Sequence, residues 1–168
     1  MSLDASLAPN KRAGIGVEIA ITTDHVPALQ LVPDEVAEHY DAVATTLITP
    51  SETIPFVGIC LLERGSIVEI KSTIRTYADG RRGRFKIRRS QHETLLDSAG
   101  AYLFVVCRDT VDRPAVALKV IPATTVDALV HSWIDSASSR SEYAQISWGS
   151  LFDPAEIEQP RAATVEER

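Results

Sequence analysis

The chain has 168 residues, of which 45% are hydrophobic and 24% charged, and its formal net charge is −6. This composition is typical of one globular domain and excludes a wholly disordered chain, because the apolar residues suffice to offset the entropy lost on ordering. The longest apolar runs, Pro55 to Leu62 and Ala101 to Cys107, are far shorter than the ~20 residues of a membrane-spanning helix. An acidic average also argues against nucleic-acid binding, unless the charge is unevenly distributed.

The compartment is predicted from the N-terminus and the cysteines. Residues 1–14 contain no apolar segment typical of a signal peptide. Cys60 and Cys107 lie in apolar runs without metal-ligand spacing, which predicts free, buried thiols in a reducing compartment. We therefore expect a cytoplasmic protein with no membrane contact. We expect a flexible N-terminus over 1–14, one domain over 15–152 and an acidic tail over 153–168.

In the first half of the chain the pattern predicts a strand, a helix and a hairpin. Gly14 to Thr22 is a weak strand. A helix is expected to begin at Pro33 and to end before Pro50, because one helical face collects the apolar residues at steps of four, three and four, namely Val36, Tyr40, Val43 and Leu47. The β-rich runs 55–62 and 66–76, joined at Gly65, predict the hairpin.

The second half begins with a turn-rich loop over 77–83 and a strand over 84–88. Ser90 and Glu93 form a capping box that starts a helix, and Gly100 is its expected left-handed stop. The remaining elements are a buried strand over 101–107, a strand over 115–121, a helix over 125–134, a short strand over 143–148 and a loose tail from Pro154. Such a chain is an α/β protein with helices against a mixed sheet.

The sharpest local pattern is Val68-Glu69-Ile70-Lys71-Ser72. Strand side chains alternate between faces, so Glu69 and Lys71 share one face, and Val68 and Ile70 share the other. The carboxylate suits a hard cation such as Mg²⁺, and the ammonium can orient a water or stabilise charge on a phosphoryl group. An ordinary ion pair on a half-exposed strand is the alternative interpretation.

The order helix, three strands, helix, strand, with Glu69-x-Lys71 on the second strand of the hairpin, resembles the core of the PD-(D/E)xK nuclease superfamily. The stretch Gly83-Arg84-Phe85-Lys86-Ile87, then Gln91-His92-Glu93, Leu95-Leu96 and the strand from Gly100, is similar to its restriction-endonuclease-like branch. The resemblance covers roughly residues 33–108 and implies an αβββαβ core. It also implies hydrolysis of nucleic acid, DNA in particular, with Mg²⁺ or Mn²⁺.

The resemblance has one departure, which concerns the acid of the first half-motif. The family carries it on the preceding strand, some nine to twelve positions before the glutamate, where this chain has Gly58 and Cys60 instead. A thiol is a poor ligand for a hard cation. Glu52 and Glu63 are alternative acids beside this strand, and both also fit solvated loops. The site is therefore either completed by another acid or degraded.

Two helices offer further candidates. The family often adds a glutamate from the first helix, and Glu35 flanks the apolar face of the predicted helix, so the resemblance makes Glu35 and Glu69 the metal ligands; the alternative is that Glu35 merely favours the helix N-terminus. Related nucleases place a glutamine at the start of the second helix, which implies a supporting role for Gln91. His92 could act as a general base, although a lone histidine beside a helix cap is more often a surface or packing residue.

The charge is unevenly distributed. The 19 positions from Lys71 to Arg89 hold eight basic residues and one acid, giving +7 and leaving −13 for the rest of the chain. This strip suits the phosphates of a nucleic acid, and six of its members are predicted to bind them: Arg75, Arg81, Arg82, Arg84, Lys86 and Arg88.

Three functions remain open. The first is a Mg²⁺-dependent endonuclease in which Glu69, Lys71, Glu35 and Gln91 form the catalytic set. The second is a catalytically degraded domain of the same fold that binds nucleic acid. The third is a protein-interaction subunit, as in a homodimer whose acidic body meets the basic strip of the partner.

Overall fold

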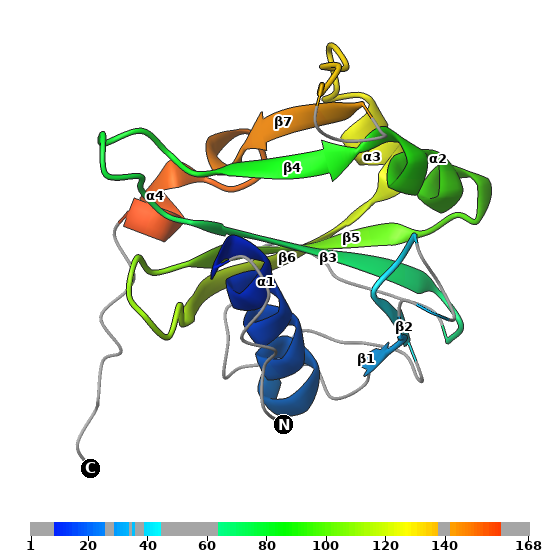
Figure 1. The fold of residues 1–168 in the computed structure, drawn as a ribbon, viewed down its shortest axis with the longest axis horizontal. Helices are drawn as coiled ribbons and strands as arrows, with labels where there is room; N and C mark the ends of the chain where they lie inside the picture. Colours follow the sequence, from blue (N-terminus) through cyan, green and yellow to red (C-terminus); the bar gives the residue numbers. More distant parts are fainter. Residues whose placement is uncertain are drawn as a thin grey trace.

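The computed structural model describes residues 9–25, 29–33, 35, 39–44, 64–137 and 142–158. Its centre is a five-stranded mixed sheet in the order β1-β2-β3-β5-β6 (Figure 1). The strands are β1 Leu29–Leu31, β2 Ala42–Ala44, β3 Ile67–Ile74, β5 Ala101–Cys107 and β6 Ala115–Pro122. β3 and β5 are parallel, and every other neighbouring pair is antiparallel.

β5 occupies an interior place in the sheet because its sequence is apolar on both faces. All seven of its residues are buried, as the continuous apolar run predicts. β3 alternates instead: Val68 and Ile70 face one side of the sheet, and Glu69 lies on the other. The mixed α/β fold with a sheet flanked by helices, expected from the sequence, is confirmed.

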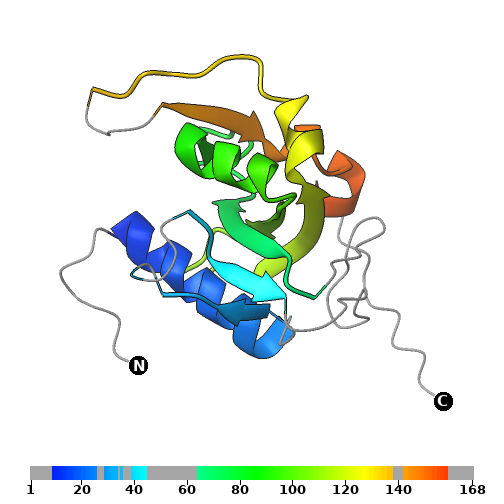
Figure 2. The ribbon, with the colours of Figure 1, turned by 90° about the vertical axis from the view of Figure 1, so that its right-hand side faces the viewer.

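One face of the sheet is covered by α1 (Pro9–Ala20), which continues as a π-helical turn over Ile21–His25 (Figures 1 and 2). Val17 and Ile21, four residues apart, are buried against Val68 and Ile70. The strand predicted over Gly14 to Thr22 is therefore wrong. Val17 and Ile21 lie on one helical face, and the sheet buries that face.

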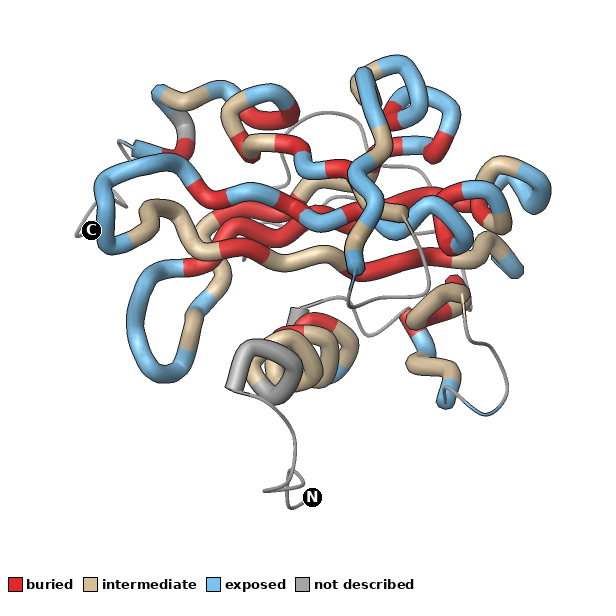
Figure 3. Tube along the Cα trace, turned by 45° about the horizontal axis from the view of Figure 1, so that its top comes forward, coloured by how far each residue is buried: buried red, intermediate tan, exposed pale blue. Residues whose placement is uncertain are grey.

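The opposite face carries α2 (Arg89–Asp97), α3 (Ala123–Asp127) and a separate two-stranded ribbon of β4 (Arg84–Arg88) and β7 (Tyr143–Ser147) (Figure 1). Phe85 and Ile87 of β4 turn inward, onto Tyr102 and Phe104 of β5. The burial colouring of Figure 3 shows this alternation along the ribbon, with its outward residues exposed. A 3₁₀ turn over Trp148–Ser150 and α4 (Pro154–Glu158) close the described chain.

The helix predicted from Pro33 is wrong for the residues that the structure describes. Glu35 lies in a turn, and Ala42–Ala44 form β2, which pairs antiparallel with β3 through Ala42↔Val68. Ala42 and Ala44 are buried while Val43 is less so, which is a strand pattern imposed by the neighbouring strand. The predicted strand 55–62, and with it the first strand of the hairpin, lies outside the described residues.

Two boundary predictions are corrected at α2. The N-cap residue is Arg88, whose side chain makes no capping hydrogen bond, so Ser90 lies inside the first turn and does not cap the helix. At the other end the left-handed residue is Ala99, with φ +50, and not Gly100. Gly100 is needed for space, because a Cβ there would lie 2.6 Å from Leu95 Cδ2 and 2.8 Å from Ile67 Cγ1.

Two predictions near the C-terminus also change. The helix expected over 125–134 is confined to α3. Ile134 instead forms an isolated antiparallel β-bridge with Tyr143, the first residue of β7. Part of the expected loose tail is α4, where Ile157 is fully buried in the apolar cluster on this face. At Ile134 the two backbone hydrogen bonds with Tyr143 decided the local structure, and at α4 the burial of Ile157 did.

Candidate active site

Glu69 and Lys71 project from β3 onto the face that α2 covers. The Lys71 Nζ donates to Glu69 Oε1 at 2.5 Å. Only 2% of the Glu69 side chain and 16% of the Lys71 side chain is exposed. The carboxylate is therefore sheltered from water and the lysine is mostly buried, which differs from the half-exposed ion pair that was the alternative.

A second carboxylate, Asp41, reaches the same place from the start of β2. Its backbone N–H donates to the Val68 carbonyl at 2.9 Å, which extends the β2–β3 ladder by one residue. Its Oδ2 accepts from the Ile70 backbone N–H at 2.7 Å. Asp41 is thus fixed by two bonds to β3, one on each side of Glu69.

The electrostatics of Glu69 reflect this neighbourhood. Burial raises the pKa of the Glu69 carboxyl to about 7, and the nearby Asp41 adds to the increase, while Lys71 opposes it. The buried Oε2 of Glu69 has no hydrogen-bond partner. An acid beside a second acid, with one oxygen unsatisfied, is a costly arrangement for an isolated protein, and it suits a site that receives a positive charge.

Gln91 completes the contacts of Lys71. It lies in the first turn of α2, is buried, and its Oε1 accepts from Lys71 Nζ at 3.1 Å. Lys71 is therefore held between a carboxylate and a neutral amide from two different elements. The structure brings together three of the residues predicted from the sequence: Glu69, Lys71 and Gln91.

The outward face of the ribbon is basic. Arg84, Lys86 and Arg88 of β4 are all exposed, and we call these three residues the basic ribbon. The Lys86 Nζ lies 4.3 Å from the centre of the Tyr143 ring on β7. The strand alternation predicted for this segment is confirmed, and it separates the three cations from the apolar side chains beneath them.

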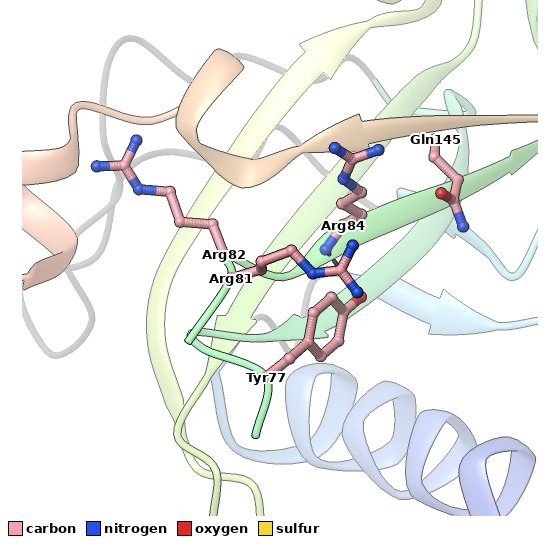
Figure 4. A pocket seen from close by; sticks show the side chains of 5 residues that line it. All are labelled: Tyr77, Arg81, Arg82, Arg84 and Gln145. Atoms are coloured by element: carbon pink, nitrogen blue, oxygen red, sulfur yellow. Dashed lines mark hydrogen bonds between the residues drawn. The ribbon is translucent and has the colours of Figure 1, made fainter. Parts of the chain in front are cut away.

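A small cavity of about 160 Å³ adjoins the basic ribbon at the loop before β4, and we call it the arginine pocket (Figure 4). Five residues line it: Tyr77, Arg81, Arg82, Arg84 and Gln145. Arg81 pairs with Asp79 at 2.7 Å, and Arg82 points away toward α4, where it pairs with Glu158 at 2.9 Å. In Figure 4 the Arg81 guanidinium lies beside the Tyr77 hydroxyl, and the Arg84 side chain projects away from it toward β7. The sixth predicted cation, Arg75, is half-buried at the end of β3.

Comparison with known proteins identifies the family. A family profile described as a PD-(D/E)XK nuclease superfamily domain matches residues 5–153. The chain belongs to the PD-(D/E)XK nuclease superfamily. Comparisons with curated proteins and with solved structures gave no match. The matched range includes Asp41, Glu69, Lys71 and Gln91, and it begins before α1, so the resemblance extends well beyond the residues 33–108 on which it was first based.

Within this PD-(D/E)XK domain, Asp41 is an acid beside Glu69 that sequence reasoning did not single out. The first-motif acid was sought nine to twelve positions before Glu69, yet Asp41 lies 29 positions before Ile70, the residue whose amide it binds. The sequence there holds only a short apolar run, Ala42-Val43-Ala44, directly after Asp41, and such a run does not distinguish a strand from a helix. The helical spacing of the apolar residues led to the prediction of a helix for this segment instead of a strand.

Of the other acids considered from the sequence, Glu35 is described, and it does not lie at this place. Glu35 is exposed in a turn, and no hydrogen bond or ion pair joins it to Glu69, Lys71 or Gln91, all of which are described. Four other positions considered for the first-motif acid lie outside the described residues, namely Glu52, Gly58, Cys60 and Glu63.

The remaining expectations concern thiols and membranes. Cys107 is free and buried, and burial raises the pKa of its thiol to about 11, which makes it unreactive at neutral pH. Cys60 is not among the described residues. In the part of the chain that the structure describes, no helix combines the length and the apolar character needed to cross a bilayer.

Proposed function

We propose that this chain hydrolyses phosphodiester bonds of DNA with the help of Mg²⁺ or Mn²⁺. The observation that carries the proposal is the juxtaposition of Asp41 and Glu69 beside Lys71, with Glu69 Oε2 buried and unsatisfied. Two carboxylates are the donor type that a hard divalent cation prefers, and a cation would remove the repulsion that raises the Glu69 pKa. Mg²⁺ is commonly held by one or two carboxylates together with water and substrate phosphates, so Asp41 and Glu69 fit such an ion, although no group of three His, Cys, Asp or Glu side chains lies together among the described residues.

Asp41 and Glu69 would hold the metal ion in this proposal. A bound divalent cation supplies Lewis-acid chemistry and lowers the pKa of a coordinated water. The chain contributes the remaining functions. Lys71, restrained by Glu69 and Gln91, presents its ammonium where it can orient the attacking water and stabilise negative charge on the phosphoryl group. Gln91 keeps that ammonium from turning away.

DNA would be bound through its phosphates along the basic ribbon, with one phosphate in the arginine pocket. Arg81 and Arg84 offer guanidinium donors there, and the Tyr77 hydroxyl, which accepts from the Arg84 backbone N–H at 3.0 Å, keeps its own hydrogen for a ligand. Such contacts position a duplex without reading its sequence. The free, buried Cys107 supports a reducing compartment, and we propose the cytoplasm.

The proposal is tested by incubating the protein with plasmid DNA and Mg²⁺ or Mn²⁺. We expect cleavage by the parent protein, and losses of about 10²–10³-fold in rate for Asp41→Asn, Glu69→Gln and Lys71→Met, because each removes charge from the reacting centre. Asp112→Asn, an exposed acid in the loop after β5, is the matched control and should cleave normally.

Calorimetry with Mn²⁺ separates the alternatives. The endonuclease proposal requires a binding site that Asp41→Asn and Glu69→Gln both lose. If the parent protein cleaves nothing and binds no Mn²⁺ but still binds duplex DNA, the chain is a non-catalytic DNA-binding domain. If it binds no DNA at low salt and forms a dimer that dissociates as salt rises, it is an interaction subunit, and the proposal is overturned.

A further inference from the structure

A line of three polar side chains runs beneath the candidate active site. His92 of α2 is 1% exposed, and both of its ring nitrogens are engaged. Its Nδ1 lies 2.9 Å from the Tyr102 hydroxyl on β5, and its Nε2 lies 3.0 Å from Asp127 Oδ1 on α3. The line therefore ties together three elements on this face of the sheet, namely α2, β5 and α3.

Donor and acceptor roles along the line follow from the groups themselves. The Asp127 carboxylate can only accept, so His92 donates through Nε2–H. In the neutral imidazole, Nδ1 is then an acceptor, and the Tyr102 hydroxyl donates to it. Each group thus has one consistent role. Because Asp127 is 57% exposed while His92 is buried, the line is anchored at the surface and ends in the interior.

Two members of the line, His92 and Tyr102, adjoin the residues of the candidate active site. His92 directly follows Gln91 in the first turn of α2, and Gln91 accepts from Lys71. Tyr102 is the register partner of Glu69 on the neighbouring parallel strand, so the two side chains share one face of the sheet. Fixing His92 and Tyr102 therefore fixes where α2 places Gln91 relative to β3.

We propose that His92 is a positioning residue of the active site, which through Tyr102 and Asp127 locks the first turn of α2 so that Gln91 holds Lys71. This inference rests on the proposed nuclease function and deepens it. An apolar side chain of similar size would fill the same volume without burying two polar nitrogens. A polar network at this position instead specifies one geometry, because its hydrogen bonds are satisfied in one arrangement only.

The first test compares cleavage kinetics of four variants. His92→Phe keeps the ring and removes both hydrogen bonds, while Asp127→Ala removes only the exposed anchor. We expect both to lower kcat, by about 10–100-fold for His92→Phe, with KM for DNA changed less than about twofold. Asp127→Asn, whose amide oxygen still accepts, should recover most of the kcat lost in Asp127→Ala. Leu96→Ala is the control for a simple loss of packing on the same helix.

The second test does not require cleavage. Lys71 is labelled with a small amine-acylating reagent and its modification is followed by peptide mass spectrometry. We expect His92→Phe and Asp127→Ala to label several-fold faster than the parent protein and Leu96→Ala to match it. If the parent protein cleaves no DNA but both variants still label faster than it does, the positioning role is supported and only the nuclease proposal is rejected. Active protein in which both variants keep normal kcat and normal Lys71 labelling overturns the inference.

Discussion

At Glu69 the demands of stability and of the proposed chemistry differ. Its carboxyl is buried beside Asp41, and burial with that neighbour raises its pKa to about 7, from a usual value of 4.5. A group with a raised pKa in the folded state holds its proton longer there than in the unfolded chain. The free energy of unfolding therefore falls as the pH rises from 4.5 to about 7, and stays low above that range.

Replacing Glu69 by Gln should remove this pH-dependent cost. We expect Glu69→Gln to be more stable than the parent protein at pH 8, by up to about 3 kcal/mol, and to lose most of this advantage at pH 5. The amide oxygen can still accept from Lys71. Urea unfolding at the two pH values without divalent cations measures the effect. Equal stability differences at both pH values would show that Glu69 titrates normally.

At the scale of elements, the end of α2 shows how a helix stop is built. The Ala99 N–H bonds to the Leu96 carbonyl at 3.3 Å and the Gly100 N–H to the Leu95 carbonyl at 2.7 Å, which is the Schellman pattern. The left-handed position of this pattern favours glycine, and Ala99 occupies it at φ +50. The glycine that follows has a different reason, since Gly100 is pressed against Leu95 and Ile67.

Ala99→Gly should therefore stabilise the protein by about 0.5–1 kcal/mol, because it removes the Cβ from a left-handed residue. Gly100→Ala should destabilise it by about 1–3 kcal/mol through overlap with its neighbours. Thermal and urea unfolding measure both. Ser98→Gly, at a residue with φ −103, serves as the control and should be slightly destabilising. A loss of stability in Ala99→Gly would contradict the argument.

At the scale of the whole molecule, a net charge of −6 conceals a segregated distribution. The three cations of the basic ribbon lie on one side of β4, and the arginine pocket adjoins them. Binding to DNA through this surface would release counterions and depend steeply on salt. The average charge of the chain therefore says little about the surface that would meet a ligand.

Arg84→Gln, Lys86→Gln and Arg88→Gln combined should weaken DNA binding and flatten its salt dependence. The slope of log K against log salt concentration should decrease by about 2–3, since each phosphate contact contributes about 0.9. Fluorescence anisotropy with a labelled duplex measures it. The matched control removes three exposed or half-exposed cations elsewhere, Arg64, Arg108 and Arg113, by the same change to Gln. If both triple variants weaken binding equally, binding depends on the overall charge of the protein and not on the basic ribbon.

The sequence by itself determined what depends on local pattern: the buried β5, the alternation of β3 and β4, α2, and the Glu69–Lys71 pair with Gln91 nearby. Only the tertiary structure decided what depends on distant neighbours. Ala42–Ala44 became a strand because β3 offers it hydrogen bonds. That pairing placed Asp41 beside Glu69, where its carboxylate accepts from the amide of Ile70, 29 positions later in the sequence. No periodicity records such a contact, because strand pairing is specified by the partner and not by the segment alone.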